Sequence, residues 1–327
     1  MSGYPEIRLR RLRQTESLRR MLDMPMPGPE KFIWPVFVVE GRNKKEPIAS
    51  MPGQYRFSTD ILLKEISKAA SVGIGGVLVF GVPEKGRKDN IGSMAYSEKG
   101  TVQRAIKAIK SEFPKLVLCS DVCLCAYTEH GHCGPLAKDG SVDNDKANIM
   151  LARTAVSHAE AGADCVAPSA MMDGQVTAIR HALDDAEFSN TLLMSYSTKF
   201  ASAMYGPFRD AENSAPGKGD RKGYQASGAE PRQALRESTL DEQEGADMLM
   251  VKPALFYLDL LSKLRAQTQL PIAAYNVSGE YSMLIAAVDR GWGDLKGMVR
   301  ESTLALSRAG ADIIISYWAN RYKELLA

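Results

Sequence analysis

The sequence has little that would connect it with a membrane, a nucleic acid or an oxidising compartment. It contains no apolar run near the ~20 residues that a bilayer span needs, and its beginning lacks the apolar segment of a signal peptide. Its 41 basic and 39 acidic residues nearly cancel, so the overall charge favours no polyanionic partner. Five cysteines, an odd number with three in one segment, argue against a disulfide framework. We therefore expect a cytoplasmic protein that acts on small molecules.

The segment 121–134 contains three of the five cysteines and two of the four histidines. Cysteines this close together predict a metal site, and zinc is the metal that soft thiolate ligands favour. Cys123, Cys125 and Cys133 alone would leave one coordination position open, as in catalytic zinc sites. A closed zinc site with three cysteines and one histidine, or a redox pair, fits the same spacing.

Short β-rich apolar runs alternate with amphipathic segments along most of the chain, as a parallel βα barrel requires. Eight strands are expected, at 33–39, 76–81, 115–122, 165–170, 191–197, 248–253, 271–278 and 312–318. Helices are expected at 60–70, 146–161, 232–244 and 303–309, and glycines 73, 162, 245 and 310 lie where helices stop. Cys119 and Cys165 lie inside strands and are expected to pack in the core. The sequence therefore predicts an α/β fold, a (β/α)8 TIM barrel over residues 31–327.

An open doubly wound sheet is the alternative architecture, and it needs a glycine-rich phosphate loop after an early strand. The glycines at 73, 75 and 76 precede their strand instead, which disfavours this fold. The segment 213–228 contains four glycines and is expected to form a mobile lid over the barrel.

The first 30 residues are expected to form an arm outside the barrel. Six arginines lie there, at positions 8, 10, 11, 13, 19 and 20, interrupted by Glu6 and Glu16. The proline-rich stretch 24–29 is typical of an extended segment that packs on another surface. We expect the arm to make an oligomer contact; a solvated tail or a targeting segment fits the same composition.

Polar residues follow the expected strands at their carboxyl ends, where barrel active sites lie. Two of them are lysines, since Lys199 follows the fifth strand and Lys252 ends the sixth. A second cation close by and partial burial both favour a neutral amine, which can form a Schiff base with a ketone or an aldehyde. Each lysine could instead pair with a carboxylate or extend its ammonium group into solvent at the rim.

Further candidates lie at the same end of the expected barrel. Arg209 and Arg221 lie on loop segments, where guanidinium groups suit the capture of a carboxylate. Ser278 and Tyr317, at the ends of the seventh and eighth strands, could donate hydrogen bonds to a second anionic group. Ordinary loop polarity explains either residue equally well.

Six motifs together are more specific: Asp121 to Gly134, Ala167 to Gly174, Met194 to Phe200, Tyr205 to Asp210, Met250 to Pro253 and Val277 to Tyr281. On these motifs the chain resembles the porphobilinogen synthase (5-aminolevulinate dehydratase) family over nearly its whole length. The resemblance implies a barrel lyase that condenses two molecules of 5-aminolevulinate into porphobilinogen with loss of two waters. That reaction is an early step toward heme and other tetrapyrroles.

The resemblance also implies roles for individual residues. Lys252 would hold one substrate as a Schiff base, and Lys199 would hold the second. Cys123, Cys125 and Cys133 would ligate a catalytic zinc ion. Some family members have aspartate-rich ligands instead and do not need zinc, so the three cysteines imply that this chain is zinc-dependent.

The remaining implied roles concern the two substrate carboxylates. Arg209 and Arg221 would bind one of them, with Gln225 on the same loop as a helper. Ser278 and Tyr317 would bind the other.

Three more residues have implied roles of a weaker kind. Asp121 and Ser169 would move protons or orient a lysine. Glu237 matches the position that helps to bind an allosteric magnesium ion at a subunit interface in magnesium-stimulated members, and a solvated helix residue is the alternative. The N-terminal arm resembles the arm that wraps a neighbouring barrel in the family's homo-octamer.

Two other functions were weighed from the sequence. A class I aldolase shares the barrel and a Schiff-base lysine but has no use for a site of three cysteines. A non-catalytic metal-binding homologue would have lost a lysine or a cysteine, and none is lost. The sequence leaves open whether His130 or His132 helps to hold a second metal ion.

Overall fold

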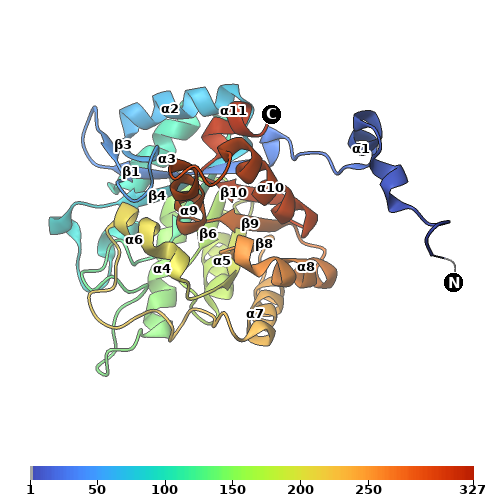
Figure 1. Cartoon of the computed structure of the whole chain (residues 1–327). Helices are drawn as coiled ribbons and strands as arrows, with labels where there is room; N and C mark the ends of the chain where they lie inside the picture. The colour runs from blue at the N-terminus through green and yellow to red at the C-terminus, as the bar shows by residue number, and fades with distance from the viewer. Residues whose placement is uncertain (1–2) are drawn as a thin grey trace.

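The computed structural model of the protein describes residues 3–327, and its central element is a closed barrel of parallel strands (Figure 1). The barrel strands, in their order around it, are β1 (Phe32–Val39), β4 (Gly76–Val82), β5 (Val117–Val122), β6 (Cys165–Pro168), β7 (Leu192–Lys199), β8 (Met248–Lys252), β9 (Ile272–Asn276) and β10 (Ile313–Ser316). The ring closes where β1 pairs with β10, at Phe32 opposite Ile314. All eight strands expected from the sequence are confirmed.

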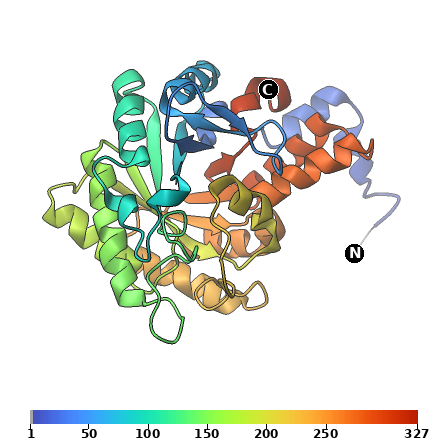
Figure 2. The same ribbon diagram turned by 90° about the vertical axis from the view of Figure 1, so that its left-hand side faces the viewer.

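Helices surround the strands, as the view in Figure 2 shows. They are α2 (Thr59–Ser71), α3 (Thr101–Glu112), α4 (Asn144–Glu160), α5 (Gln175–Asp185), α6 (Gly206–Glu212), α7 (Pro231–Gln243), α8 (Leu258–Gln267), α9 (Ser278–Asp289), α10 (Leu295–Arg308) and α11 (Tyr322–Leu325). The four helices expected from the sequence are present. The one expected at 303–309 is only the second half of α10.

The boundaries differ from the sequence expectation in two respects. The seventh expected strand stops at Asn276, because Ser278 begins α9, and the eighth stops at Ser316, one residue before Tyr317. The sequence also gave no sign of a short antiparallel pair, β2 (Lys45–Pro47) and β3 (Tyr55–Ser58), which extends the sheet beside β1. Both strands are too short to produce an apolar pattern, and all three residues of β2 are exposed.

Burial on both faces explains why the strands have nearly continuous apolar sequences. All eight residues of β1 are buried, because one face lines the barrel and helices cover the other. Glycines 73, 162, 245 and 310 have φ between +91° and +112°, a left-handed conformation in which each terminates a helix before the next strand, as expected.

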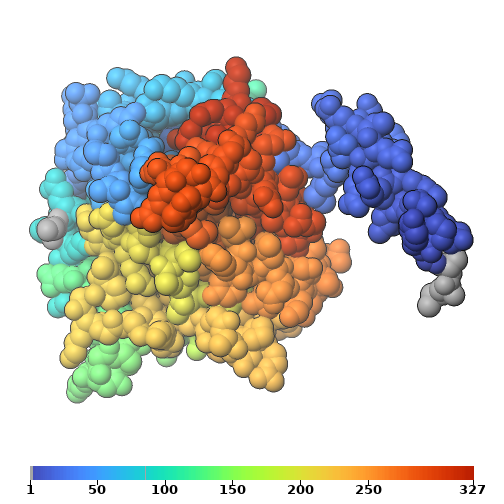
Figure 3. Space-filling model, in the orientation of Figure 1, coloured from blue at the N-terminus to red at the C-terminus, as the bar shows by residue number. Residues whose placement is uncertain are grey.

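The N-terminal arm stands away from the barrel in Figures 1 and 3. It contains a short 3-10 helix, Leu9–Arg13, and α1 (Glu16–Leu22), and neither buries a residue. The arm meets the barrel near Pro27, whose carbonyl oxygen accepts a hydrogen bond of 2.8 Å from the Tyr322 hydroxyl. Residues 1–2 of the expected arm lie outside the described residues. Within 3–327, no helix has both the length and the apolar character needed to cross a bilayer.

Candidate active site and metal centre

The structure brings most of the candidate residues together at the carboxyl ends of the barrel strands. Asp121 lies on β5, and Ser169 directly follows β6. Lys199 is the last residue of β7 and Lys252 is the last residue of β8. The loops that carry the cysteines and Arg221 lie at the same mouth, because Arg221 Nη2 donates a hydrogen bond of 2.9 Å to the Gly131 carbonyl oxygen in the cysteine loop. Arg209, expected on a loop, lies instead on the short helix α6.

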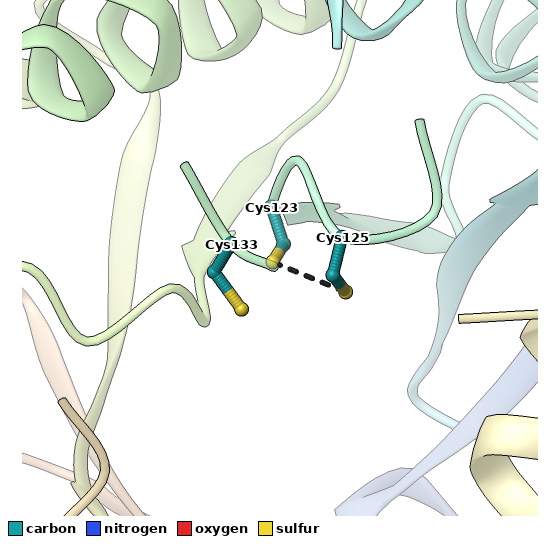
Figure 4. A group of neighbouring side chains, drawn as sticks. All are labelled: Cys123, Cys125 and Cys133. Atoms are coloured by element: carbon teal, nitrogen blue, oxygen red, sulfur yellow. Dashed lines mark hydrogen bonds between the residues drawn. The ribbon is translucent and has the colours of Figure 1, made fainter. Parts of the chain in front are cut away.

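The three clustered cysteines form a site that suits a zinc ion. Cys123, Cys125 and Cys133 are buried and free of disulfides, and their Sγ atoms all lie within 4.8 Å of one another. Figure 4 shows the three side chains turned toward one space, with 3.4 Å between the Cys123 and Cys125 sulfurs. Sulfurs bound tetrahedrally to one zinc ion lie about 3.8 Å apart, given Zn–S bonds of ~2.3 Å. The donor chemistry and the spacing therefore both fit zinc.

Neither histidine of the loop belongs to this cluster. Among residues 3–327 the group contains cysteines only. His132 is engaged elsewhere, with Nδ1 3.1 Å from the Tyr224 hydroxyl and Nε2 3.0 Å from the Lys218 carbonyl oxygen. His130 Nε2 lies 3.2 Å from the Asn90 carbonyl oxygen. The arrangement favours a three-cysteine site with an open position over a closed one with histidine.

The two lysines are register partners on adjacent strands. Only 5% of Lys199 and 3% of Lys252 is exposed, which is rare for lysine. Burial, and after it the neighbouring Lys199 cation, lower the pKa of Lys252 to about 7. In a substantial fraction of the protein molecules, the Lys252 side chain is therefore a neutral amine near neutral pH.

Aromatic rings surround the Lys252 amine. Its Nζ lies 4.3 Å from the ring centre of Tyr275 and 4.8 Å from those of Tyr196 and Phe208. The Tyr205 hydroxyl donates a hydrogen bond of 2.9 Å to the backbone carbonyl of the same lysine. The three rings form a cage around the amine. Because ring faces stabilise a cation, this cage also suits a positively charged adduct of the lysine.

Ser169 contacts Lys199 directly, whereas Asp121 acts on the lysines only through its charge. The Lys199 ammonium donates a hydrogen bond to the backbone carbonyl of Ser169, so this contact does not use the serine hydroxyl. Asp121 is partly exposed at the mouth, while its Oδ1 atom is buried and has no hydrogen-bond partner within residues 3–327. Burial and the nearby Glu212 carboxylate raise the pKa of Asp121 to about 7.

Glu212 is a buried carboxylate that the sequence analysis missed. It is the last residue of α6 and only 2% exposed, and its Oε2 atom lies 3.5 Å from the Cys125 sulfur. Burial and Cys125 raise its pKa to about 8. The sequence feature that could have revealed Glu212 is its position three residues after Arg209, because residues three apart are neighbours on the surface of one helix.

The three residues expected to bind one carboxylate have unpaired polar atoms. Arg209 Nε, Arg221 Nε and both side-chain polar atoms of Gln225 are buried without a hydrogen-bond partner in the described chain. Buried polar atoms are usually paired, so donors left without a partner point to a ligand. Burial lowers the pKa of Arg209, and the positive charge of Arg221 adds to this effect.

Ser278 and Tyr317 already have partners within the chain. The Ser278 hydroxyl accepts a hydrogen bond of 2.9 Å from the backbone N–H of Phe208 and lies 3.3 Å from the Met204 carbonyl oxygen. Tyr317 is fully buried, and its hydroxyl lies 3.2 Å from that of Tyr275, one ring of the Lys252 cage. Both residues therefore border the lysine pair from the β9 and β10 side.

Glu237 lies on α7, away from the lysines. It lines a cavity of about 470 Å³ together with Asn144, Asp173 and Gln233. Burial raises the pKa of Glu237, and the Asp173 carboxylate raises it further. Two carboxylates that line one cavity suit a divalent cation with oxygen ligands.

Comparisons with known proteins agree over almost the full chain. The profile of the family described as Delta-aminolevulinic acid dehydratase matches residues 6–325. The Delta-aminolevulinic acid dehydratase of Bacillus subtilis is 50% identical over 98% of this chain and 98% of its own length. That of Archaeoglobus fulgidus is 48% identical over the whole of both chains. The crystal structure of the Toxoplasma gondii enzyme with its reaction product porphobilinogen has a TM-score of 0.94 at 42% identity, covering 96% of this chain and 90% of that one.

Proposed function

The chain belongs to the delta-aminolevulinic acid dehydratase family, and we propose that its barrel mouth condenses two molecules of 5-aminolevulinate into porphobilinogen with loss of two waters. The observation that carries this proposal is the register pairing of two buried lysines beside a three-cysteine site. The family match argues against the aldolase alternative, and the presence of both lysines and all three cysteines argues against a non-catalytic homologue. The activity is that of a hydro-lyase in heme and porphyrin biosynthesis.

Lys252 is assigned to one of the two Schiff bases. Its neutral amine adds to the ketone carbon of one substrate, and loss of the ketone oxygen as water leaves a protonated Schiff base. A pKa of about 7 supports this role, because a lysine with its ordinary pKa would be protonated and unreactive. The rings of Tyr275, Tyr196 and Phe208 would stabilise the cationic adduct and exclude water from it.

Lys199 is assigned to the second substrate. Because Lys199 lies opposite Lys252, the two lysines would hold the two substrate ketones on neighbouring strands. The two substrates would then react as an oriented pair and would not depend on a chance encounter in solution. Asp121 would exchange protons with these groups through its unpaired Oδ1 atom, and the Ser169 carbonyl oxygen would orient the Lys199 amine. These contacts support the assignment of both residues as neighbours of the reacting amines.

The substrate carboxylates would bind on opposite sides of the lysine pair. The unpaired nitrogens of Arg209, Arg221 and Gln225 support one carboxylate site. The hydroxyls of Ser278 and Tyr317 would serve the other, after exchanging a present hydrogen bond for one to the ligand.

Zinc is the metal we assign to Cys123, Cys125 and Cys133, and its Lewis acidity would lower the pKa of an amino group or water in the open fourth position. Glu237 would contribute to a regulatory magnesium site, supported by its shared cavity with Asp173.

The exposed arm over residues 1–30 would contact a second subunit within a homo-octamer, supported by its lack of any buried residue in its two helical segments. Free cysteines throughout suit the cytoplasm.

The test is to incubate the protein with 5-aminolevulinate and measure the pyrrole colorimetrically, with a zinc chelator and then with zinc restored. We expect pyrrole that disappears on chelation and returns with zinc. Cys133→Ser should lower both the bound zinc and the activity, while Cys165→Ala, which removes a buried thiol outside the triad, should keep both. No pyrrole with zinc and magnesium supplied would contradict the proposal, and pyrrole indifferent to chelation would contradict the role of the cysteines.

A further inference from the structure

Strand β7 changes its register immediately before Lys199. Ser195 pairs with Leu249 on β8, and the next paired positions are Thr198 with Val251. Three steps along β7 therefore match two steps along β8, so β7 contains one extra residue. Because side chains alternate between the two faces of a strand, one extra residue reverses the face of every residue that follows it.

The contacts of the side chains confirm this reversal. Tyr196 faces the barrel interior, where its ring lies 4.8 Å from Lys252 Nζ and 5.6 Å from Lys199 Nζ. Ser197 and Thr198 both point outward and contact α7. Regular alternation after Tyr196 would place Thr198 inside the barrel and Lys199 outside. The extra residue is therefore what turns Lys199 toward Lys252.

One buried hydroxyl on α7 holds the two outward-facing residues. Ser238 Oγ donates a hydrogen bond of 2.9 Å to Ser197 Oγ and, since its single proton is used there, accepts one of 2.5 Å from Thr198 Oγ1. Thr198 Oγ1 also lies 3.2 Å from the carbonyl oxygen of Ala234, one helical turn before Ser238. At most 1% of each of the three hydroxyl residues is exposed, so water cannot replace these bonds.

A second contact fixes the strand on the other side of the register shift. Ser195 Oγ donates a hydrogen bond of 2.5 Å to Asp241 Oδ2, on the same face of α7 as Ser238. The helix thus holds β7 both before and after the extra residue. Since bulges persist where surrounding contacts determine them, this double attachment explains why the irregular backbone is kept.

We propose that Ser238 is a positioning residue for the reaction: by binding the hydroxyls of Ser197 and Thr198 outside the barrel, it keeps the extra residue of β7 in place and Lys199 directed at the substrate. This inference rests on the proposed Schiff-base role of Lys199. It assigns Ser238 no contact with the substrate. Lys252 lies on β8, which has no such irregularity before it, so its orientation does not depend on Ser238.

The experiment traps the Schiff bases with borohydride in the presence of 5-aminolevulinate and quantifies the adduct at each lysine by peptide mass mapping. Ser238→Ala removes the shared hydroxyl. Thr198→Val removes the facing hydroxyl at nearly constant shape, and Thr198→Ser restores it. Thr239→Ala is the matched control, because Thr239 is the next residue on α7 and its exposed hydroxyl bonds only the Leu235 carbonyl oxygen of its own helix.

We expect Ser238→Ala and Thr198→Val to lower the adduct at Lys199 and kcat roughly ten- to hundredfold, the effect of misplacing a reacting group by about 1 Å. The adduct at Lys252 should stay within about twofold, and Thr198→Ser and Thr239→Ala should behave as the native protein. An unchanged Lys199 adduct in both variants, or equal losses at both lysines, overturns the proposal. Absence of any adduct in the native protein would instead overturn the proposed function, so the two failures are distinguishable.

Discussion

Lys199 and Lys252 occupy directly opposite positions on the adjacent parallel strands β7 and β8, and both are almost fully buried. Two lysine amines this close in a buried environment cannot both be fully protonated without a large cost in free energy. Asp121, Glu212 and Cys125 act against this effect, since their negative charges raise the pKa of Lys252. Burial and Lys199 nevertheless dominate, and the pKa of Lys252 falls to about 7.

The first prediction concerns the pH dependence of Lys252. Its amine is neutral above its pKa, so the initial rate of Schiff-base trapping at Lys252 should rise as the pH passes about 7. Lys199→Met removes the neighbouring cation and should move this midpoint to higher pH by about one unit. The rate of the Lys252 adduct, measured by mass mapping across pH, checks both statements. An unmoved midpoint would mean that the two ammonium groups do not interact.

The second prediction concerns the carboxylate of Glu212. Its raised pKa of about 8 leaves Glu212 largely protonated near neutral pH, and a cation bound beside the Cys125 sulfur, 3.5 Å from the Glu212 Oε2 atom, would favour the ionised carboxylate. The ionised carboxylate would in turn favour the cation in the cysteine site. Glu212→Gln keeps the shape and removes the charge, so we expect zinc affinity to fall about tenfold, the lower end of what outer-shell partners contribute.

Competition with a chelator of known affinity measures this change directly. Glu129→Gln is the control, because Glu129 lies in the same cysteine loop but is exposed. Equal zinc affinities in the native protein and Glu212→Gln would show that the carboxylate does not act on the metal.

The third prediction concerns Arg56, on the short strand β3. Its guanidinium donates hydrogen bonds of 2.6 Å to the carbonyl oxygens of Asp210 and Ala211, near the end of α6. This pair of hydrogen bonds from one guanidinium group, the fork, caps the C-terminal end of the helix that carries Arg209. Lysine cannot form the same pair of bonds. Arg56→Lys should therefore raise KM for 5-aminolevulinate several-fold while kcat changes less.

Steady-state kinetics at fixed zinc distinguishes these effects. Arg104→Lys is a suitable control, because Arg104 is exposed and pairs only loosely with Glu40, at 3.6 Å. A KM identical to the native value would show that α6 keeps its position without the fork.

The fourth prediction concerns the arm. It exposes large apolar side chains, among them Ile7, Leu9, Leu12 and Met21, each more than half accessible. Such exposure of apolar side chains marks a contact surface. Removing residues 1–23, while keeping the stretch around Pro27 that packs on the barrel, should lower both the oligomer size and the activity.

Size-exclusion chromatography with light scattering measures the oligomer, and Leu9→Glu combined with Leu12→Glu tests the same surface without truncation. An elution volume equal to that of the full chain in both proteins would contradict an oligomer contact through the arm.

Much of the barrel could be predicted because its signals are local. Each strand is a short apolar run, since both faces of a barrel strand are buried, and the helices α2, α4, α7 and α10 are each followed by a glycine that adopts a positive φ. The cysteine site was also predictable, because its three ligands lie within eleven residues, from Cys123 to Cys133. The positions of Lys199 and Lys252 near strand ends followed from the same strand pattern.

Other features depend on segments that are distant in the sequence. Glu212 belongs to the cysteine site only because α6 folds back over the mouth, and nothing near it in the sequence indicates a metal. The short strands β2 and β3 have no apolar pattern, yet Arg56 on β3 holds α6 from more than 150 residues away. Contacts of this kind are set by packing between elements, which has no local sequence signal.

The sequence by itself therefore determined the barrel, the three thiol ligands and the identity of the two amines, because residue type and strand periodicity are local properties. Only the tertiary structure decided that the amines face each other. Strict alternation along β7 would turn Lys199 out of the barrel, and one extra residue, held by Ser238 from α7, turns it in. A strand's register depends on its neighbours, so the physical reason lies in side-chain contacts that form only when the helix packs on the sheet.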